Sequence, residues 1–518
     1  MEITSFALFG YEGEIVKVET DLRRGIPAID IVGLPDGAVK EARERMRAAI
    51  INSGLAFPRE RVLINLSPAD LKKEGSSFDL PIALSVLSAA EGPALPADRS
   101  AIMVLGELEL SGKVRPVKGV LAAVTLGARR GISRYIVPAD NAAEAFICGG
   151  VRIAGVKTLG EAVAAMNGFS GPDNLRQNVY ENSPGKREKD FCVKWTDAGP
   201  HFSGFEEIRG QAQLVRALQI AAAGGHHLLA YGPPGSGKTL AIQHFPLLLP
   251  EMDYKTALAV TRIHSIAGTL RQETLFSDAD QDCLPGNMLI KIPPFRQPHP
   301  GASLEGMVGG GKGCGPGEIS LAHGGVLFLD EAVQFKASVL QALRTPVETG
   351  FVTVSRAGKS CLYPAAFQLI MAINPCPCGN FAAPGRVCIC SPDIIQRYWK
   401  RLTAPLLDRV DLRIQVPVPQ ADSLAGFPSV STDTLREGIE RARRLQWERN
   451  RADKNTENGN GWLNAAFSPH EIGRFCRLQP DVQLYFTERI KKECYSGRGS
   501  HGILKVARTI ADMEKSEK

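Results

Sequence analysis

One stretch decides the fold of this chain of 518 residues: Gly232-Pro233-Pro234-Gly235-Ser236-Gly237-Lys238-Thr239. It fits the pattern G-x-x-x-x-G-K-[ST], follows an apolar run at 228–231 and precedes a helical pattern from residue 240. Glycines in such a loop let backbone N–H groups close around phosphate oxygens at a helix N-terminus. Lys238 would place its charge on the β- and γ-phosphates, and Thr239 would offer its hydroxyl to Mg²⁺. The sequence therefore predicts an α/β P-loop domain that binds and hydrolyses ATP.

Two further apolar runs end in polar side chains that this chemistry needs. The run at 325–329 ends in Asp330 and Glu331. A P-loop ATPase uses one carboxylate for the Mg²⁺ shell and another to polarise the attacking water, and we assign these roles to Asp330 and Glu331 in that order. The run at 367–373 delivers Asn374, which suits a sensor that orients the water. A turn-forming asparagine before Pro375 is the alternative.

An arginine follows the short apolar turn at 405–407. The fixed guanidinium of Arg409 suits the negative charge that develops on phosphate in the transition state. The competing interpretation is a surface arginine paired with Asp408 or Asp411.

Four of the eleven cysteines form two CxC pairs just after Asn374: Cys376, Cys378, Cys388 and Cys390. Four thiolates can hold a tetrahedral Zn²⁺ ion. The spacing is tighter than the usual CxxC, so free thiols or a redox pair stay open as alternatives.

The composition, 44% hydrophobic and 22% charged, is typical of a globular protein. The length predicts about two to four domains. The net charge of +6 is compatible with a polyanionic partner but is weak support for one. The N-terminus lacks a signal-peptide pattern and no apolar run reaches membrane-spanning length, so we expect a cytoplasmic protein without a membrane partner.

The pattern of apolar residues divides the chain into four parts. Residues 1–169 alternate β-like runs (61–66, 101–105) with helical patterns (39–52, 81–90), and residues 170–201 read as a polar linker. Residues 202–425 form the P-loop α/β domain with a mostly parallel sheet. Residues 426–518 are expected to be an α-helical domain that begins with a basic helix at 434–451 and continues past a polar loop at 453–461.

Residues 202–418 resemble the magnesium-chelatase type of AAA+ module, and the whole chain resembles the YifB/ComM family of magnesium-chelatase-like competence proteins. The motifs that carry this resemblance are those at 294–299, 308–311, 316–323 and 406–409. The resemblance implies a homohexameric ring in which Arg409 completes the neighbouring subunit's site and Arg508 acts as a second sensor. It also implies a helix-2 insert at the pore, within residues 265–311. The chain departs from the family at 332–334, at the glycine-rich 495–500 and in its shortened C-terminus.

The N-terminal domain resembles the S5-fold domain of Lon proteases. Ser77 stands where Lon carries its nucleophile, but Leu121 stands at the position of the catalytic lysine. A serine needs a nearby base, and Lys118 lies about one helical turn from that position. We therefore expect a non-proteolytic structural or DNA-handling unit.

The residues themselves predict ATP hydrolysis, and the resemblance implies an ATP-driven DNA motor, a hexameric helicase or branch-migration factor in natural transformation and recombination. Single-stranded or branched DNA and recombination proteins are the partners that the family implies. Two alternatives remain: a magnesium-chelatase ATPase subunit and an ATP-dependent protease.

Overall fold

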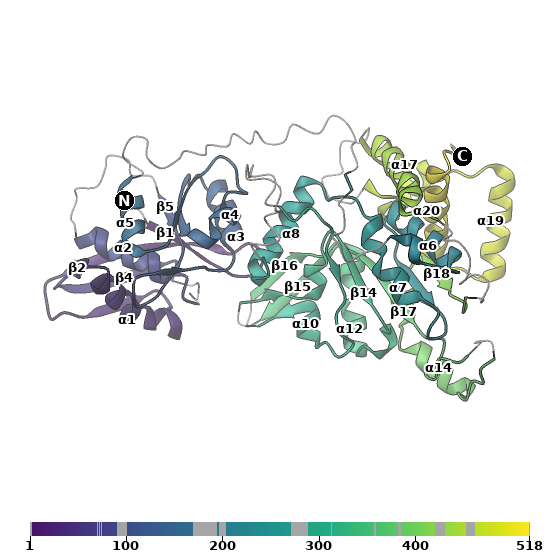
Figure 1. The fold of residues 1–518 in the computed structure, drawn as a ribbon, viewed down its shortest axis with the longest axis horizontal. Helices are drawn as coiled ribbons and strands as arrows, with labels where there is room; N and C mark the ends of the chain where they lie inside the picture. The colour runs from purple at the N-terminus through teal and green to yellow at the C-terminus, as the bar shows by residue number, and fades with distance from the viewer. Residues whose placement is uncertain are drawn as a thin grey trace.

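The computed structural model describes residues 3–69, 71, 73, 75–90, 101–168, 194–195, 204–270, 289–311, 313–356, 359–381, 385–419, 430–451 and 462–516. An N-terminal α/β unit, a central α/β unit and a helical C-terminal unit follow one another along the long axis of the molecule (Figure 1). The predicted linker lies outside the described residues apart from Lys194 and Trp195, and so does the predicted loop at 453–461. Of the predicted insert, residues 271–288 lie outside them as well.

The N-terminal unit is built on a seven-stranded mixed sheet with the order β3-β4-β2-β1-β5-β8-β9. Its strands are β1 (Ile3–Ala7), β2 (Glu14–Arg23), β3 (Ile29–Val32), β4 (Arg61–Ser67), β5 (Ile102–Val104), β8 (Arg134–Pro138) and β9 (Arg152–Val156). The sheet is accompanied by helices α1 (Gly37–Asn52), α2 (Asp79–Ala90), α3 (Val120–Arg129), α4 (Ala142–Ala145) and α5 (Leu159–Gly168) and by a ribbon of β6 (Glu107–Leu108) and β7 (Val114–Arg115). The strands predicted at 61–66 and 101–105 and the helices predicted at 39–52 and 81–90 are confirmed.

The central unit holds a five-stranded sheet in which every pairing is parallel. Its order is β11 (Phe295–Arg296), β14 (Val326–Leu329), β17 (Gln368–Ile373), β10 (Leu228–Tyr231) and β18 (Leu412–Gln415). All four residues of β14 are buried, as expected of a strand covered on both faces. Parallel strands place their carboxyl ends at one edge, so the loops after β10, β14 and β17 lie together.

Helices and short strands surround this sheet. They are α6 (Ala212–Gly224), α7 (Lys238–Gln243), α8 (Tyr254–Ala267), α10 (Leu304–Val308), β12 (Gly309–Gly310), β13 (Gly315–Pro316), α11 (Glu318–Leu321), α12 (Ala337–Ala342), α13 (Arg344–Thr349), β15 (Phe351–Arg356), β16 (Lys359–Pro364), α14 (Pro392–Lys400) and α15 (Ala404–Leu407). Helix α14 stands at the edge of the unit (Figure 1).

The C-terminal unit consists of α17 (Thr432–Arg451), α18 (Pro469–Phe475), α19 (Pro480–Glu493) and α20 (Gly497–Met513). Two basic residues of α17 face inward. Arg443 is only 9% exposed and donates to the carbonyl of Ala222, while Arg449 pairs with the buried Asp512. These two contacts hold α17 against α6 and α20. The glycine-rich stretch before residue 500 forms the start of α20, where the hydroxyl of Ser496 accepts the N–H of Gly499 at 3.0 Å.

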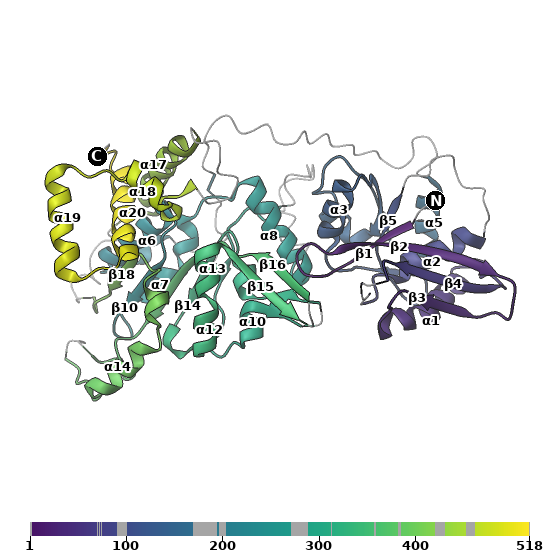
Figure 2. The same cartoon turned by 180° about the vertical axis from the view of Figure 1, so that it is seen from behind.

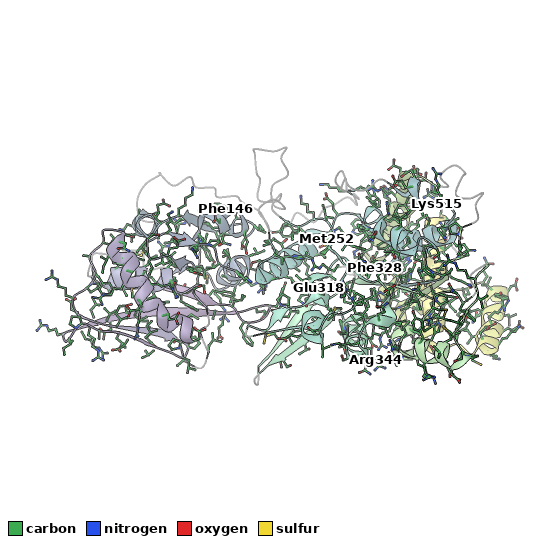
Figure 3. All side chains as sticks on the ribbon, turned by 60° about the horizontal axis from the view of Figure 1, so that its bottom comes forward. Phe146, Met252, Glu318, Phe328, Arg344 and Lys515 are labelled. Atoms are coloured by element: carbon green, nitrogen blue, oxygen red, sulfur yellow. The ribbon has the colours of Figure 1, made fainter. Side chains whose placement is uncertain are left out.

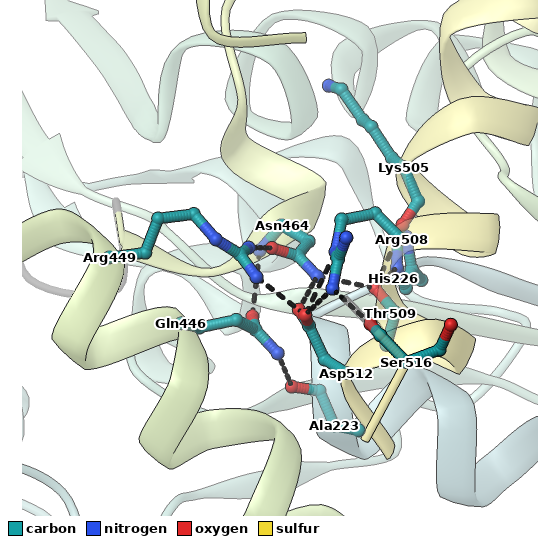
Figure 4. A network of polar contacts seen from close by, with 10 residues as sticks. All are labelled: Ala223, His226, Gln446, Arg449, Asn464, Lys505, Arg508, Thr509, Asp512 and Ser516. Carbon is teal, nitrogen blue, oxygen red and sulfur yellow. Dashed lines mark hydrogen bonds and ion pairs between the residues drawn. The ribbon is translucent and has the colours of Figure 1, made fainter. Parts of the chain in front are cut away.

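A buried imidazole joins this helical unit to the central sheet. The Nδ1 atom of His226 lies 2.8 Å from a carboxylate oxygen of Asp411, and its Nε2 atom lies 2.8 Å from the hydroxyl of Thr509 on α20. Asn464 also donates to that hydroxyl (Figure 4). Because His226 and Thr509 are fully buried, these bonds hold α20 against the start of β18 without competition from water.

The N-terminal unit contacts the central unit through α8, which lies at the junction seen from behind in Figure 2. The backbone N–H of Gly119 donates to the carbonyl of Ser265. Glu144 is buried there and accepts from the N–H of Leu121 at 2.8 Å and from the hydroxyl of Ser265. Burial raises the pKa of the Glu144 carboxyl above its usual range.

Apolar side chains from both units close the same junction. Phe146 and Met252 lie on its two sides (Figure 3) and pack against a cluster of buried side chains: Leu121, Ile147, Ala257 and Leu289. The polar contacts of Glu144 are therefore shielded on one side by hydrocarbon.

We expect Glu144→Ala to loosen this junction because it leaves the N–H of Leu121 and the hydroxyl of Ser265 unpaired. Each unpaired buried group costs about 1–3 kcal/mol. Glu144→Gln keeps an acceptor oxygen for Leu121 and Ser265 and loses only the bond from the side-chain amide of Asn141, so it should cost less. Calorimetry and limited proteolysis of the full chain would measure the difference, with the exposed Glu44→Ala as control. Equal behaviour of the alanine and glutamine variants would contradict this account.

Candidate functional site

The loop between β10 and α7 has the conformation that its glycines allow. Gly235 and Gly237 have φ angles of 79° and 82°, in the left-handed region that disfavours side chains. A Cβ atom on Gly232 would lie 2.1 Å from the carbonyl oxygen of Val416. These positions leave the loop backbone free to approach a phosphate closely.

Lys238 is held inside this loop. Its ammonium donates to the carbonyls of Gly232 and Pro233, both at 2.8 Å, and to the hydroxyl of Ser236 at 3.2 Å. The side chain is buried, and this burial lowers the pKa of Lys238 against the opposing effect of the Asp330 and Glu331 charges. A desolvated ammonium gains from pairing with an anion, which suits the binding of phosphate.

The two carboxylates lie at the end of β14, beside the start of α7. The hydroxyl of Thr239 donates to Asp330 at 3.1 Å, which brings together the two oxygen ligands predicted for Mg²⁺. Glu331 has a φ angle of 50°, and the amide of Gln334 donates to its carboxylate at 2.5 Å. Gln334 is one of the residues at which the chain departs from the family pattern, and here it fixes the carboxylate predicted to polarise water.

These groups line one cavity of about 340 Å³. Asn374 also lines it, because β17 ends beside β14 and β10. The left-handed glycines, the buried ammonium and the Thr239–Asp330 pair fit a nucleoside triphosphate with Mg²⁺. The residues that line the cavity are 234–240, Asp330, Glu331, Ala372, Ile373 and Asn374, and neither Arg409 nor Arg508 is among them.

Arg409 lies at a different place, where it contacts an exposed carboxylate. It donates to the carbonyl of Pro405 at 2.6 Å and pairs with Glu348 at the end of α13. The interpretation that paired Arg409 with Asp408 or Asp411 is wrong, since Asp408 accepts from Ser496 and Asp411 contacts His226.

A second arginine, Arg498 in the first turn of α20, contacts the other oxygen of Glu348 at 2.5 Å. The guanidinium groups of Arg409 and Arg498 hold the pKa of the Glu348 carboxyl below its usual range. Sequence reasoning missed Arg498, although a cation just after the helix-capping Ser496 was a usable signal.

Arg508 is hydrogen-bonded within the helical unit. Its guanidinium donates to Asp512 at 2.9 and 2.7 Å and to the carbonyl of Ser516 at 2.9 Å (Figure 4). Asp512 is fully buried and is shared with Arg449. The structure therefore places Arg508 in the network that holds α17 and α20 together, while Arg498 is the residue beside Arg409.

The four predicted ligand cysteines converge next to the cavity. Their sulfur atoms all lie within 4.8 Å of one another. The sulfurs of Cys376 and Cys378 are 3.3 Å apart, and each lies 3.7 Å from that of Cys388. A tetrahedral site with Zn–S bonds of about 2.3 Å has sulfurs about 3.8 Å apart. The cluster thus has the dimensions of a zinc site.

The Lon-like positions of the N-terminal unit make different contacts. Ser77 accepts through its carbonyl from the N–H of Gly106. The ammonium of Lys118 lies 3.4 Å from the carbonyl of Ala267 at the end of α8, and Leu121 is fully buried on α3. Lys118 is therefore occupied at the junction between the two units.

Three family models cover most of the chain. The model described as magnesium chelatase, subunit ChlI, matches residues 204–424, subunit ChlI of Mg-chelatase matches 18–141, and the ChlI C-terminal model matches 429–518. Competence protein ComM of Haemophilus influenzae and the uncharacterized protein YifB of Escherichia coli are each 37% identical over 99% of this chain and 93% of their own lengths. The chain belongs to the YifB/ComM family.

Membership of the YifB/ComM family makes this chain an AAA+ ATPase of the magnesium-chelatase type. A Lon protease of Desulfovibrio desulfuricans is 25% identical over 25% of this chain and 15% of its own, in keeping with the predicted Lon-like element of the fold. Within the described residues, no helix has both the length and the apolar composition needed to cross a membrane.

We expect Lys238→Ala and Glu331→Gln to fail at different steps. Loss of the ammonium removes the charge that faces phosphate, so Lys238→Ala should abolish ATP binding. Glu331→Gln keeps the pocket but cannot polarise water, so binding should persist while turnover falls about 10²–10⁴-fold. Equilibrium binding of a fluorescent ATP analogue and steady-state ATPase rates would separate the two, with Glu440→Gln on α17 as control. Near wild-type turnover in Glu331→Gln would remove it from the mechanism.

Proposed function

We propose that the chain is one subunit of a homohexameric ring that hydrolyses ATP to move along or remodel DNA. Its proposed role is helicase or branch-migration activity on single-stranded or branched DNA during natural transformation and recombination, in the cytoplasm and alongside recombination proteins. Support comes from the similarity to a competence protein over nearly the whole length of both chains. The AAA+ type of ATPase domain supports a ring.

In this proposal the residues of the cavity divide the work of hydrolysis. The backbone of residues 232–239 and the ammonium of Lys238 bind the phosphates. Thr239 and Asp330 would hold Mg²⁺, which neutralises charge on the phosphate oxygens. Glu331, fixed by Gln334, polarises the attacking water, and Asn374 orients it.

The observation that carries the ring proposal is the position of Arg409. It lies outside the nucleotide cavity of its own subunit and contacts the half-exposed Glu348 together with Arg498. The side chains of Arg498 and Arg409 are 44% and 16% exposed, and two guanidinium groups that share one carboxylate suit a phosphate supplied by a neighbour. Head-to-tail contacts of this kind close into a ring when they repeat by rotation. Arg508 stays a candidate second sensor, and Arg498 is a further candidate by its position.

The division of the chain into 1–169, 170–201, 202–425 and 426–518 is part of the proposal. It is supported by the bounds of the three family matches and by the separate sheets of the first two units. The first unit would be structural or DNA-handling. Because the first unit matches a chelatase family model, the presence of this unit does not by itself exclude that the chain is a chelatase subunit. The full-length similarity to ComM and YifB favours the DNA motor over both alternatives.

We also propose a zinc ion at the four cysteines. The sulfur spacings support a tetrahedral site, and the nine cysteines among the described residues form no disulfide. The backbone N–H of Phe381 donates to the sulfur of Cys376 at 3.4 Å, a contact that stabilises a thiolate ligand.

The zinc proposal predicts about one Zn²⁺ per chain. A Cys376→Ser/Cys378→Ser double variant should lose it, because two of the four soft ligands are gone. Metal analysis of anaerobically purified protein measures this directly, with the exposed Cys494→Ser as control. If the wild-type protein contains no bound metal, the zinc proposal is wrong and the four cysteines are free thiols or a redox pair.

The ring proposal predicts that Arg409→Ala binds ATP normally but loses turnover by about 10³–10⁵-fold. Mixing it with Lys238→Ala subunits should restore some activity, because the first supplies an intact pocket and the second an intact arginine. The readout is the ATPase rate across mixing ratios, with Arg489→Ala on α19 as control. The wild type should form nucleotide-dependent hexamers whose DNA binding weakens steeply with salt. A protein that stays monomeric with ATP and DNA, with an active Arg409→Ala variant, would refute the motor.

A further inference from the structure

The cysteine cluster lies directly against the proposed nucleotide site. Cys376 follows Asn374 by two residues and is fully buried. The loop then turns at Gly379, whose N–H donates to the carbonyl of Cys376 and whose φ angle is 77°. A Cβ atom on Gly379 would lie 2.7 Å from the Cδ atom of Pro234 in the phosphate-binding loop. The backbone of the cysteine loop and the phosphate-binding loop are therefore in contact.

The second cysteine pair leads into α14, and this helix returns to the backbone around Asn374. The indole N–H of Trp399 donates to the carbonyl of Pro375 at 3.0 Å. Burial raises the pKa of the Tyr398 phenol, and the nearby backbone of Asn374 acts against this shift, so the phenol lies beside Asn374. The ring of Trp399 also packs edge-on against Tyr231, the last residue of β10, with the ring centroids 5.7 Å apart. The end of β17 is thus held from α14.

Helix α14 has little else to hold it in place. None of its residues is buried, and Ile389 just before it is 85% exposed. A helix with so few packing contacts has little stability of its own. A metal ion bound by both cysteine pairs would join the start of α14 to the end of β17 and fix both ends of this connection.

We propose that zinc bound by Cys376, Cys378, Cys388 and Cys390 positions Asn374 and the phosphate-binding loop for hydrolysis, through Tyr398, Trp399 and Gly379. The metal does not touch the nucleotide in this arrangement. It sets the precision with which Asn374 is held, so its loss lowers kcat more than it weakens ATP binding. The inference rests on the proposed roles of the nucleotide site and adds a metal-dependent control of that site.

The test compares metal content, ATP affinity and kcat in the full chain. Cys388→Ser/Cys390→Ser should lose zinc and lower kcat by about 10–100-fold, the usual effect of removing a supporting contact, while Kd for a fluorescent ATP analogue changes far less. Tyr398→Phe and Trp399→Phe should keep zinc yet lower kcat, since they break the connection on its far side. Gln396→Ala, exposed on the same helix, is the matched control.

Chelation and reloading of the wild type gives a second measurement if the cysteine variants fail to fold. Reloading with Zn²⁺ should restore kcat, and Co²⁺ should give the absorption bands of a tetrahedral thiolate site. If the wild type keeps its kcat after complete removal of zinc, this inference is overturned, while the proposed function stands. A wild type that binds zinc but hydrolyses no ATP would instead sink the proposed function on which it rests.

Discussion

The parallel pairing of β14, β17 and β10 is the constraint on which the rest of the site depends. Leu329 pairs with Met371, and Tyr231 pairs with Ile373. Because of this register, three neighbouring strands end at one edge of the sheet. The residues that follow each strand supply a different chemical group. Phosphate-binding backbone, carboxylates and an amide meet there although more than a hundred residues separate the first from the last. A shift of register in any of these pairings would move its group out of the cavity.

The proposed trans-acting arginines depend on a second set of contacts that joins the helical unit to the sheet. Ser496 is bonded to Asp408, Arg498 and Arg409 share Glu348, and Asp411 contacts the imidazole that binds Thr509. Residues on both sides of Arg409 are thus bonded to α20 or to its partner His226. These contacts consequently link the positions of the two guanidiniums, and a movement of α20 would disturb them.

Local signals made much of this structure predictable. The phosphate-binding loop, the strand before Asp330 and the strand before Asn374 are each contained in a short stretch with its own periodicity, so sequence alone located them. The partner of Arg409 could not be found in this way, because Glu348 lies 61 residues from Arg409 and 150 residues from Arg498. Tertiary packing also decides which face of a basic helix is buried, so the inward direction of Arg443 on α17 was not visible in its composition. The role of Gln334 likewise needed the turn geometry at Glu331.

The shared carboxylate of Glu348 has a consequence for the subunit before it meets a neighbour. Two uncovered guanidiniums at one surface would attract any polyphosphate, including free nucleotide and the backbone of nucleic acid. With Glu348 between them, the patch carries one positive charge instead of two, and one guanidinium nitrogen of each arginine already donates to the carboxylate. In the proposed ring, stray anions would therefore meet a competitor, whereas a properly oriented triphosphate in a neighbour's cavity would displace the carboxylate. Glu348 would then hold the place of the neighbour's phosphate until the correct partner is bound.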